Sequence, residues 1–148
     1  MKSRLVRLGL VVGVALALSA QGAPAATGHL SGGGTASISQ VAMNVAFGGS
    51  GSASGSFNCL MAGRSAFVLG AFNLAHIMKV QATPAKGSVS GSIATFSGPG
   101  FLITDGGQRM NIDVSVWVNV ATQEFQLTVA QVGAMPVETF ASGGVSLR

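Results

Sequence analysis

Apolar residues occupy every second position in several stretches of the chain, which is the period expected of a half-buried β-strand. The clearest runs are the odd positions of 41–47, the odd positions of 57–61, the even positions of 112–120 and the odd positions of 125–129. A short turn at 121–123 joins the last two runs into the best predicted β-hairpin. The first two runs predict a second hairpin, with a long loop of Gly, Ser and Ala between its strands.

The segments between these runs are shorter or less regular. Residues 77–82 are predicted to be extended, and residues 87–96 to form a strand with a bulge near Ala94. The sequence Ser-Gly-Pro-Gly at 97–100 predicts a turn. Residues 65–75 fit a helical face and a buried strand about equally well, so both interpretations stay open.

Two more short strands are predicted near the C-terminus, at 137–140 and at 145–147, the second of them directly after Gly143-Gly144. The count then reaches about 7–8 short strands separated by glycine turns, with no convincing helix after the first 25 residues. The predicted fold class is therefore all-β, a small antiparallel β-sandwich or barrel. The pattern favours neither of these two architectures over the other.

The first 25 residues have the three parts of a secretory signal peptide. Three basic residues precede an apolar run at 8–18, and Ala23 and Ala25 are the small residues that a signal peptidase reads. The apolar run is shorter than the roughly 20 residues that a bilayer span requires. We therefore predict cleavage after Ala25, with Ala20 or Ala26 as neighbouring alternatives. The product is expected to be a bacterial protein that is secreted or periplasmic, with no stable membrane insertion after cleavage.

Cleavage changes both the domain organisation and the charge. The expected parts are a signal peptide at 1–25, a flexible Gly-rich arm at 26–34 and a single all-β domain at 35–148. Without the leader, five basic side chains remain against four acidic ones, so the net charge falls from +4 to +1. Nucleic acid is not an expected partner, because its binding requires clustered Lys and Arg.

Motifs that carry catalysis or bind cofactors are sparse in this sequence. Ala53 stands where the G-x-S-x-G nucleophile elbow needs its serine, and no phosphate-binding glycine motif precedes a predicted helix. His29, His76 and Cys59 are too few, and too scattered, for a zinc site with three or four protein ligands. We therefore expect no catalytic residue, no cofactor and no metal site.

Asp105, Asn111 and Asp113 carry oxygen atoms of the kind that calcium prefers. Asp105 precedes two glycines, however, so a β-turn in which its carboxylate bonds its own backbone is the favoured interpretation. Asp113 is then a polar residue on the solvent face of a strand.

Cys59 is the only cysteine, so it cannot form an intramolecular disulfide. Its parity matches that of Phe57 and Met61, which predicts a buried thiol. The alternative is a reactive pair with His76, which would require the thiol to be accessible and its pKa to be lowered.

Trp117 is the one candidate contact residue on the predicted surface. It shares a face with Ser115 and Asn119, opposite the valines of the 112–120 run. If that face is solvated, Trp117 is an exposed aromatic side chain that can contact a partner or a sugar. If both faces of the strand are covered, it belongs to the core, and the sequence leaves both readings open.

Several short segments resemble a known group of exported domains. They are Ala-Thr-Phe-Ser-Gly at 94–98, the Val-x-Val-x-Val strand, Glu-Phe-Gln-Leu-Thr-Val at 124–129 and Thr-Phe-Ala-Ser-Gly-Gly-Val at 139–145. Their layout resembles the bacterial exported β domains called post-COAP-1 domains, over most of residues 32–148. The resemblance implies an extracellular β module, and it transfers no catalytic residue to this chain.

These observations lead to three functional hypotheses. The first is an exported non-enzymatic β module that binds a partner, a surface polymer or a small apolar ligand. The second is a self-assembling surface or structural subunit that associates through strand edges. The third is an enzyme whose site the motifs do not show, which the shortage of His and acidic residues disfavours.

Overall fold

The computed structural model describes residues 27–62, 77–104 and 107–148. All regular secondary structure in this part of the chain is β-strand. No helix among the described residues is long and apolar enough to cross a membrane. The predicted signal peptide at 1–25 and the ambiguous stretch at 65–75 lie outside the described residues.

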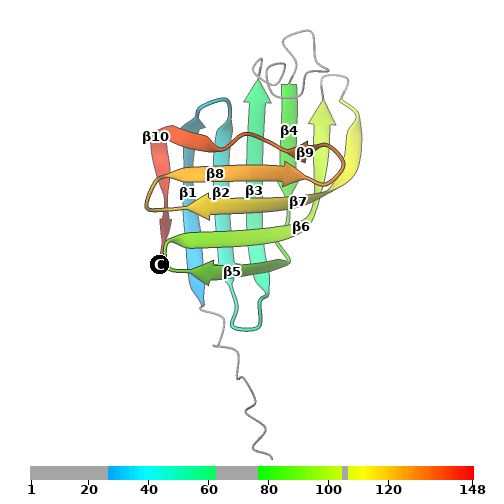
Figure 1. The fold of residues 1–148 in the computed structure, drawn as a ribbon. Helices are drawn as coiled ribbons and strands as arrows, with labels where there is room; N and C mark the ends of the chain where they lie inside the picture. The colour runs from blue at the N-terminus through cyan, green and yellow to red at the C-terminus, as the bar shows by residue number, and fades with distance from the viewer. Residues whose placement is uncertain (1–26, 63–76, 105–106) are drawn as a thin grey trace, which may run out of the picture.

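Ten antiparallel strands form one sheet that closes into a ring (Figure 1). The path runs β10-β1-β2-β3-β4-β6-β7-β8-β9, and a second pairing between β10 and β8 completes the ring, while β5 pairs with β6 beside it. The strands are β1 (Gly28–Ala36), β2 (Gln40–Phe47), β3 (Ala53–Ala62), β4 (Ile77–Ala82), β5 (Lys86–Ser90), β6 (Ile93–Thr104), β7 (Arg109–Asn119), β8 (Glu124–Val129), β9 (Gly133–Ala134) and β10 (Glu138–Leu147).

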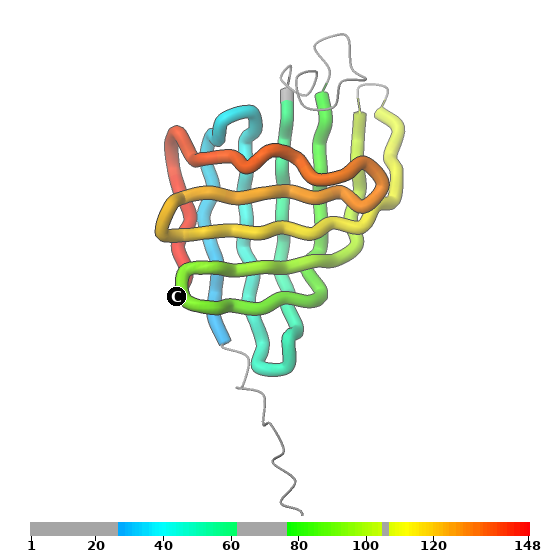
Figure 2. Tube along the Cα trace, viewed as in Figure 1, coloured from blue at the N-terminus to red at the C-terminus, as the bar shows by residue number. Residues whose placement is uncertain are grey.

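The closed sheet has two layers whose strands cross. Strands β1 to β4 and β10 lie side by side along one axis, antiparallel to their neighbours, and β5, β8 and much of β6 and β7 lie across them (Figures 1 and 2). The predicted all-β class is confirmed, with more strands than the 7–8 expected. Strands β6 and β7 are long enough to belong to both layers, so they carry the sheet around the corner.

The corner lies at the Ser-Gly-Pro-Gly sequence in the middle of β6. The predicted turn at 97–100 is wrong, because β6 pairs with β7 without a register shift from Ile93 to Ile103. The chain bends there but remains a strand. A Cβ on Gly98 or Gly100 would collide with the backbone oxygen of Thr83 or Gln81, so glycine is what lets the neighbouring segment approach so closely.

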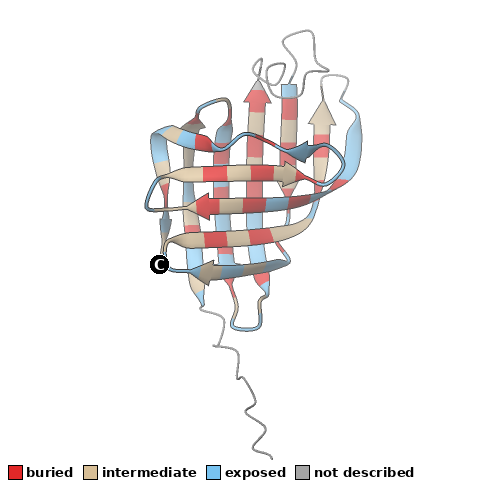
Figure 3. Ribbon diagram, viewed as in Figure 1, coloured by how far each residue is buried: buried red, intermediate tan, exposed pale blue. Residues whose placement is uncertain are grey.

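The interior of the ring is lined by the apolar residues of the alternating runs (Figure 3). The predicted inward faces of β2, β3, β7 and β8 are confirmed, since their predicted apolar positions are buried and packed in one cluster, except that Val120 lies just beyond β7 and is only partly buried. At about 25 cal/mol per Å² of buried apolar surface, this packing is the main source of stability for a chain without disulfides. The buried apolar residues of these four strands are Val41, Met43, Val45, Phe47, Ala53, Phe57, Cys59, Met61, Ile112, Val114, Val116, Val118, Phe125, Leu127 and Val129.

The glycine-rich segment at 26–34 is not a flexible arm from Gly28 onward. It forms most of β1, which pairs with β2 on one side and with β10 on the other. A Cβ on Gly34 would collide with the Ser142 backbone oxygen, and one on Gly143 with the Gly33 backbone oxygen. The glycines therefore allow the two paired backbones to approach each other closely, and the composition that suggested flexibility serves this close pairing.

Three other local predictions also need correction. Residues 87–96 form two strands rather than one bulged strand, because a tight turn at Gly91, with a φ of 58°, separates β5 from β6. The register shift in this sheet occurs instead between Thr35 and Ala36. The two short strands predicted near the C-terminus are the single strand β10, and the loop between β2 and β3 is a compact turn that Gly48 and Ser52 close through a backbone hydrogen bond of 2.8 Å.

Candidate functional site

Trp117 lies on the outer face of β7, in the layer of crossing strands. The inward positions on either side of it, Val116 and Val118, are fully buried, whereas Trp117 is only partly buried. Its face is therefore the outside of the ring and not a second core. Of the two interpretations left open by the sequence, this placement fits a surface contact.

The partners of Trp117 across the sheet are polar. Thr95 of β6 is opposite on one side and Gln126 of β8 on the other, and Ser88 of β5 extends the same row beyond Thr95. The neighbouring row consists of Lys86, Ser97, Ser115 and Thr128. We call these two rows, with Trp117 as their only aromatic side chain, the Trp117 face.

Hydrogen bonds hold parts of the Trp117 face in place. The hydroxyls of Ser88 and Thr95 lie 2.9 Å apart and share one hydrogen bond. The Gln126 amide donates from Nε2 to the Met135 carbonyl oxygen at 2.9 Å. The side chains on both sides of Trp117 are thus ordered before any ligand arrives, which lowers the entropic cost of binding.

A hollow of about 250 Å³ lies between β5, β6 and β7, and it reaches Trp117 only through Thr95, the cross-strand partner of Trp117, because Trp117 does not line it. Its lining includes the side chains of Lys86, Ser88, Thr95, Ser97 and Ser115. Each hydroxyl can both donate and accept a hydrogen bond, and the Lys86 ammonium can donate. The arrangement offers an aromatic surface beside a set of hydrogen-bonding groups, which is suited to binding a polar, hydroxyl-bearing ligand.

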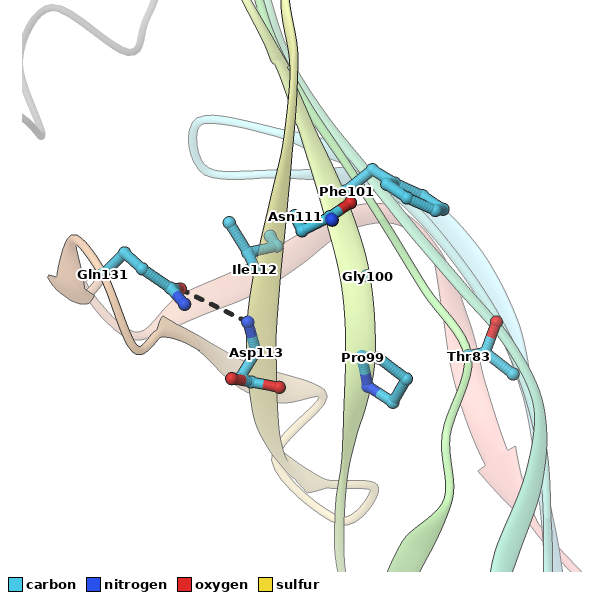
Figure 4. A pocket seen from close by; sticks show the side chains of 8 residues that line it. All are labelled: Thr83, Pro99, Gly100, Phe101, Asn111, Ile112, Asp113 and Gln131. Carbon is cyan, nitrogen blue, oxygen red and sulfur yellow. Dashed lines mark hydrogen bonds between the residues drawn. The ribbon is translucent and has the colours of Figure 1, made fainter.

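A larger hollow of about 490 Å³ lies further along β7, at the corner of the sheet (Figure 4). Asn111 and Asp113 face it from β7, and Phe101 faces it from β6 opposite Asn111. Gln131 reaches in from the turn after β8, where its Oε1 accepts a hydrogen bond of 3.3 Å from the Asp113 backbone N–H. Asp113 is exposed on the solvent side, as the sequence predicted.

No group of three or more His, Cys, Asp or Glu side chains that could hold a metal ion occurs among residues 27–62, 77–104 and 107–148. Asn111 and Asp113 do share one face of β7, but Asp105, the third member of the considered calcium set, lies outside the described residues. The predicted turn at Asp105 therefore remains a prediction.

A buried polar cluster lies at another corner, between the turn after β1 and the start of β10. The Glu138 side chain is almost completely buried and accepts a hydrogen bond of 2.9 Å from the Ile38 backbone N–H. The Ser39 hydroxyl lies 2.9 Å from both carboxylate oxygens of Glu138. Glu138 was not among the residues predicted to be functional, although its parity with Phe140 in a predicted strand indicates that it points inward.

Cys59 belongs to the edge of this cluster. Burial raises the pKa of its thiol from 9.0 to about 12, the Ser39 side chain lowers it by hydrogen bonding, and the Glu138 charge raises it. The predicted buried thiol is confirmed. A thiol held in its neutral form is a poor nucleophile.

Of the two histidines of the sequence, only His29 lies among the described residues. His29 lies on β1, exposed, with its Nε2 2.7 Å from the Asn44 side-chain oxygen. His76 lies outside the described residues, so the pairing with Cys59 cannot be placed. Burial of Cys59 nevertheless argues against a reactive pair.

No family model matches the chain, and neither a curated protein nor a solved structure matches it.

Proposed function

We propose that this chain is an exported, non-enzymatic binding module that holds a hydroxyl-rich surface polymer against the Trp117 face. The observation that carries the proposal is the position of the only tryptophan of the chain, on the outside of the sheet, with a polar side chain on each side of it in its own row and a neighbouring row that is polar throughout. Tryptophan has a large apolar ring with a polar N–H, which suits it to contacts that bury one side of a polar ligand.

The fold supports this proposal through its rigidity. Trp117 is presented by a strand with paired neighbours on both sides, so it does not have to be ordered by the ligand. Aromatic residues of this kind commonly contribute most of the affinity of an interface. The interior, by contrast, is occupied by a cluster of apolar side chains, which makes the outer face a better place for a ligand than the core.

The proposal that the protein is exported is based on its N-terminal sequence and on the resemblance to post-COAP-1 domains. We expect secreted or periplasmic protein to begin at Ala26, after the small residues Ala23 and Ala25. Intact-mass measurement of the protein recovered outside the cytoplasm tests this. A mass that retains residues 1–20 would contradict it.

The binding proposal is tested by co-sedimentation of the purified protein with insoluble polysaccharides, namely cellulose, chitin, xylan and peptidoglycan sacculi. We expect one or more of them to retain the protein. Trp117→Ala should lower the affinity by about tenfold or more, as for a central aromatic contact. Trp117→Phe should recover part of it, because a smaller aromatic ring remains on the same face.

The matched control is Ser56→Ala, a substitution at an exposed position on the outer face of β3, in the other layer. It should leave retention unchanged. Equal retention of Trp117→Ala and of the unsubstituted protein would reject the Trp117 face as the contact. Failure of every polysaccharide to retain the protein would reject the surface polymer itself.

Self-assembly is a second candidate, and one observation favours it. Strand β5 pairs with β6 on one side, and on its other side it has a single isolated bridge, between Lys86 and Ser52. A charged residue on an edge strand opposes pairing with another chain, which is why we place this function second. Sedimentation velocity across a wide concentration range tests it, since only a self-assembling subunit grows in size with concentration.

A further inference from the structure

The outer face of β7 continues well beyond Trp117. Asn111, Asp113 and Ser115 have the same parity as Trp117, so their side chains follow one another along the outside of the strand. At about 3.4 Å per residue, the path along the strand from the first of these residues to Trp117 is about 20 Å, and it follows the bend of the sheet beside Gly98 and Gly100. This length exceeds what a single small ligand would cover.

Strand β6 provides a partner for each of these residues. Phe101 is paired with Asn111, Pro99 with Asp113, and Ser97 with Ser115, in one uninterrupted register that ends with Thr95 opposite Trp117. The result is a double row of side chains with an aromatic ring at each end. We call this double row, from Phe101 to Trp117, the β6–β7 track.

The hollows along the track adjoin one another. The large hollow at Phe101 and Asn111 shares Pro99 and Asp113 with a middle hollow of about 260 Å³. The middle hollow in turn shares Lys86 and Ser97 with the one that reaches Trp117 through Thr95. The surface is therefore hollowed along the length of the track and not only at its two ends.

The charges along the track balance. Arg109 lies at the far end, with its guanidinium carbon 3.3 Å from the centre of the Phe101 ring, and Asp113 follows four residues later. Lys86 borders the middle of the track, and Glu124 lies one row beyond Trp117 on β8. Two positive and two negative groups along one groove favour neither a polyanion nor a polycation.

On these grounds we propose that the β6–β7 track holds a linear, uncharged polysaccharide chain that lies along β7 and contacts both the Trp117 end and the Phe101 end. This inference rests on the proposed function, because it specifies the polymer that the Trp117 face binds. Hydroxyl and amide groups between the ends match the donors and acceptors of sugar hydroxyls. The two aromatic side chains provide apolar surface for sugar rings, although the Arg109 guanidinium already covers one face of the Phe101 ring.

The length of the track gives the first test. Binding is measured by isothermal titration calorimetry with ladders of cello-, xylo-, manno- and malto-oligosaccharides, from disaccharide to octasaccharide. In the ladder that binds, the affinity should rise by about tenfold or more with length before it levels off. The same affinity for the disaccharide and the octasaccharide would overturn the extended track while leaving the proposed function at Trp117 intact.

Substitutions at the far end give the second test. Asn111 is exposed on the outer face, so Asn111→Ala should fold normally and weaken the octasaccharide several-fold, with little effect on the disaccharide. Ser56→Ala on the other layer is the control and should change neither. Equal loss for short and long ligands with Asn111→Ala would overturn the inference, as would no loss for either.

The absence of charge selectivity gives the third test. Affinity for the octasaccharide should change less than about twofold between low and high salt, because an uncharged ligand has no ion pair to screen. Asp113→Asn should likewise have a small effect, since the amide keeps an acceptor oxygen. Tighter binding of alginate or heparin that weakens in salt would overturn the inference in favour of a polyanion. If none of the four ladders, alginate, heparin or the insoluble polysaccharides binds, the proposed function fails together with the inference.

Discussion

The two ends of β10 join the rest of the ring by different chemistry. At its start, backbone pairing with β8 covers only Glu138 and Thr139, and the buried Glu138 carboxylate binds the turn after β1. Near the other end of β10, the side chain of Gln123 makes the connection by hydrogen bonding to the backbone of Val145. Its Nε2 donates to the Val145 carbonyl oxygen at 3.0 Å, and its Oε1 accepts from the Val145 N–H at 2.9 Å.

The comparison shows how a ring can close where its backbone ladder does not continue. Gln123 presents a donor and an acceptor, so its amide replaces a backbone partner for Val145 and is itself neutral. Glu138 presents two acceptor oxygens to an N–H and a hydroxyl, in a place from which water is excluded. A buried charge depends on its partners more than a neutral amide does, so the Glu138 end should be the more sensitive of the two.

Replacement of Glu138 should have the largest effect. Glu138→Ala leaves the Ile38 N–H and the Ser39 hydroxyl without their acceptor and opens a cavity, so the free energy of unfolding should fall by about 3–5 kcal/mol. Urea denaturation measures the loss. Glu138→Gln keeps the volume and one acceptor oxygen, and it should lose less. A loss below about 1 kcal/mol for the alanine variant would remove the contrast between the two ends.

Replacement of Gln123 should have the second-largest effect on the free energy of unfolding. Gln123→Ala removes both hydrogen bonds to Val145 and a third one to the Val120 carbonyl oxygen, and it should cost about 2 kcal/mol. Gln123 has a positive φ of 57°, which glycine adopts without strain. Gln123→Gly should therefore cost about 1 kcal/mol less than alanine in the same urea titration. Equal losses for the two variants would show that backbone strain at this position is unimportant.

The thiol beside the Glu138 cluster should make stability depend on alkaline pH. The pKa of Cys59 is about 12 in the folded protein against 9.0 without burial, so above pH 9 the unfolded chain releases a proton that the folded chain keeps. The free energy of unfolding should therefore be unaffected by Cys59 below pH 9. It should fall as pH rises from 9 towards 12, by at most about 1.4 kcal/mol per pH unit.

The matched control for this pH dependence is Cys59→Ala, which removes the titrating group. Urea denaturation at a series of pH values should show a shallower decline for this variant than for the unsubstituted protein. Identical slopes would mean that Cys59 is accessible to solvent, or that it ionises equally in both states.

The smallest effect is expected on the exposed side of the Glu138 corner. The Ser37 hydroxyl accepts a hydrogen bond of 3.2 Å from the Thr139 backbone N–H, where water can replace it. Ser37→Ala should cost about 0.5 kcal/mol or less in urea denaturation. A loss as large as that of Gln123→Ala would mean that the turn, and not the buried carboxylate, holds this end of β10.

Alternation by itself identified much of the core. Successive side chains of a strand point to opposite faces, so a short segment of sequence is enough to show which residues share the apolar face. Alternation placed Val116, Val118 and Cys59 inside, and it placed Trp117 on the opposite face of its strand. It could not tell whether that opposite face was covered. That depends on how the layers cross, which only the tertiary structure decides.

Segments whose structure depends on distant partners were mispredicted. Gly32, Gly33 and Gly34 suggest flexibility by composition, yet β1 is a strand because β2 and β10 flank it and need the absence of side chains. The turn predicted at 97–100 is a bend within β6, because pairing with β7 continues through it. Local composition describes what the backbone can do, whereas hydrogen bonding to remote strands decides what it does.

The sequence alone determined the all-β class, the inward and outward parity of the main strands and the scarcity of catalytic groups. The tertiary structure decided how the ring closes through Glu138 and Gln123, and which side chains surround Trp117. These features bring together residues that are far apart in the chain, such as Ser39 and Glu138, and no local periodicity encodes such a pairing. Cross-strand register, which the whole sheet sets, is the physical reason that they could be found only in the folded molecule.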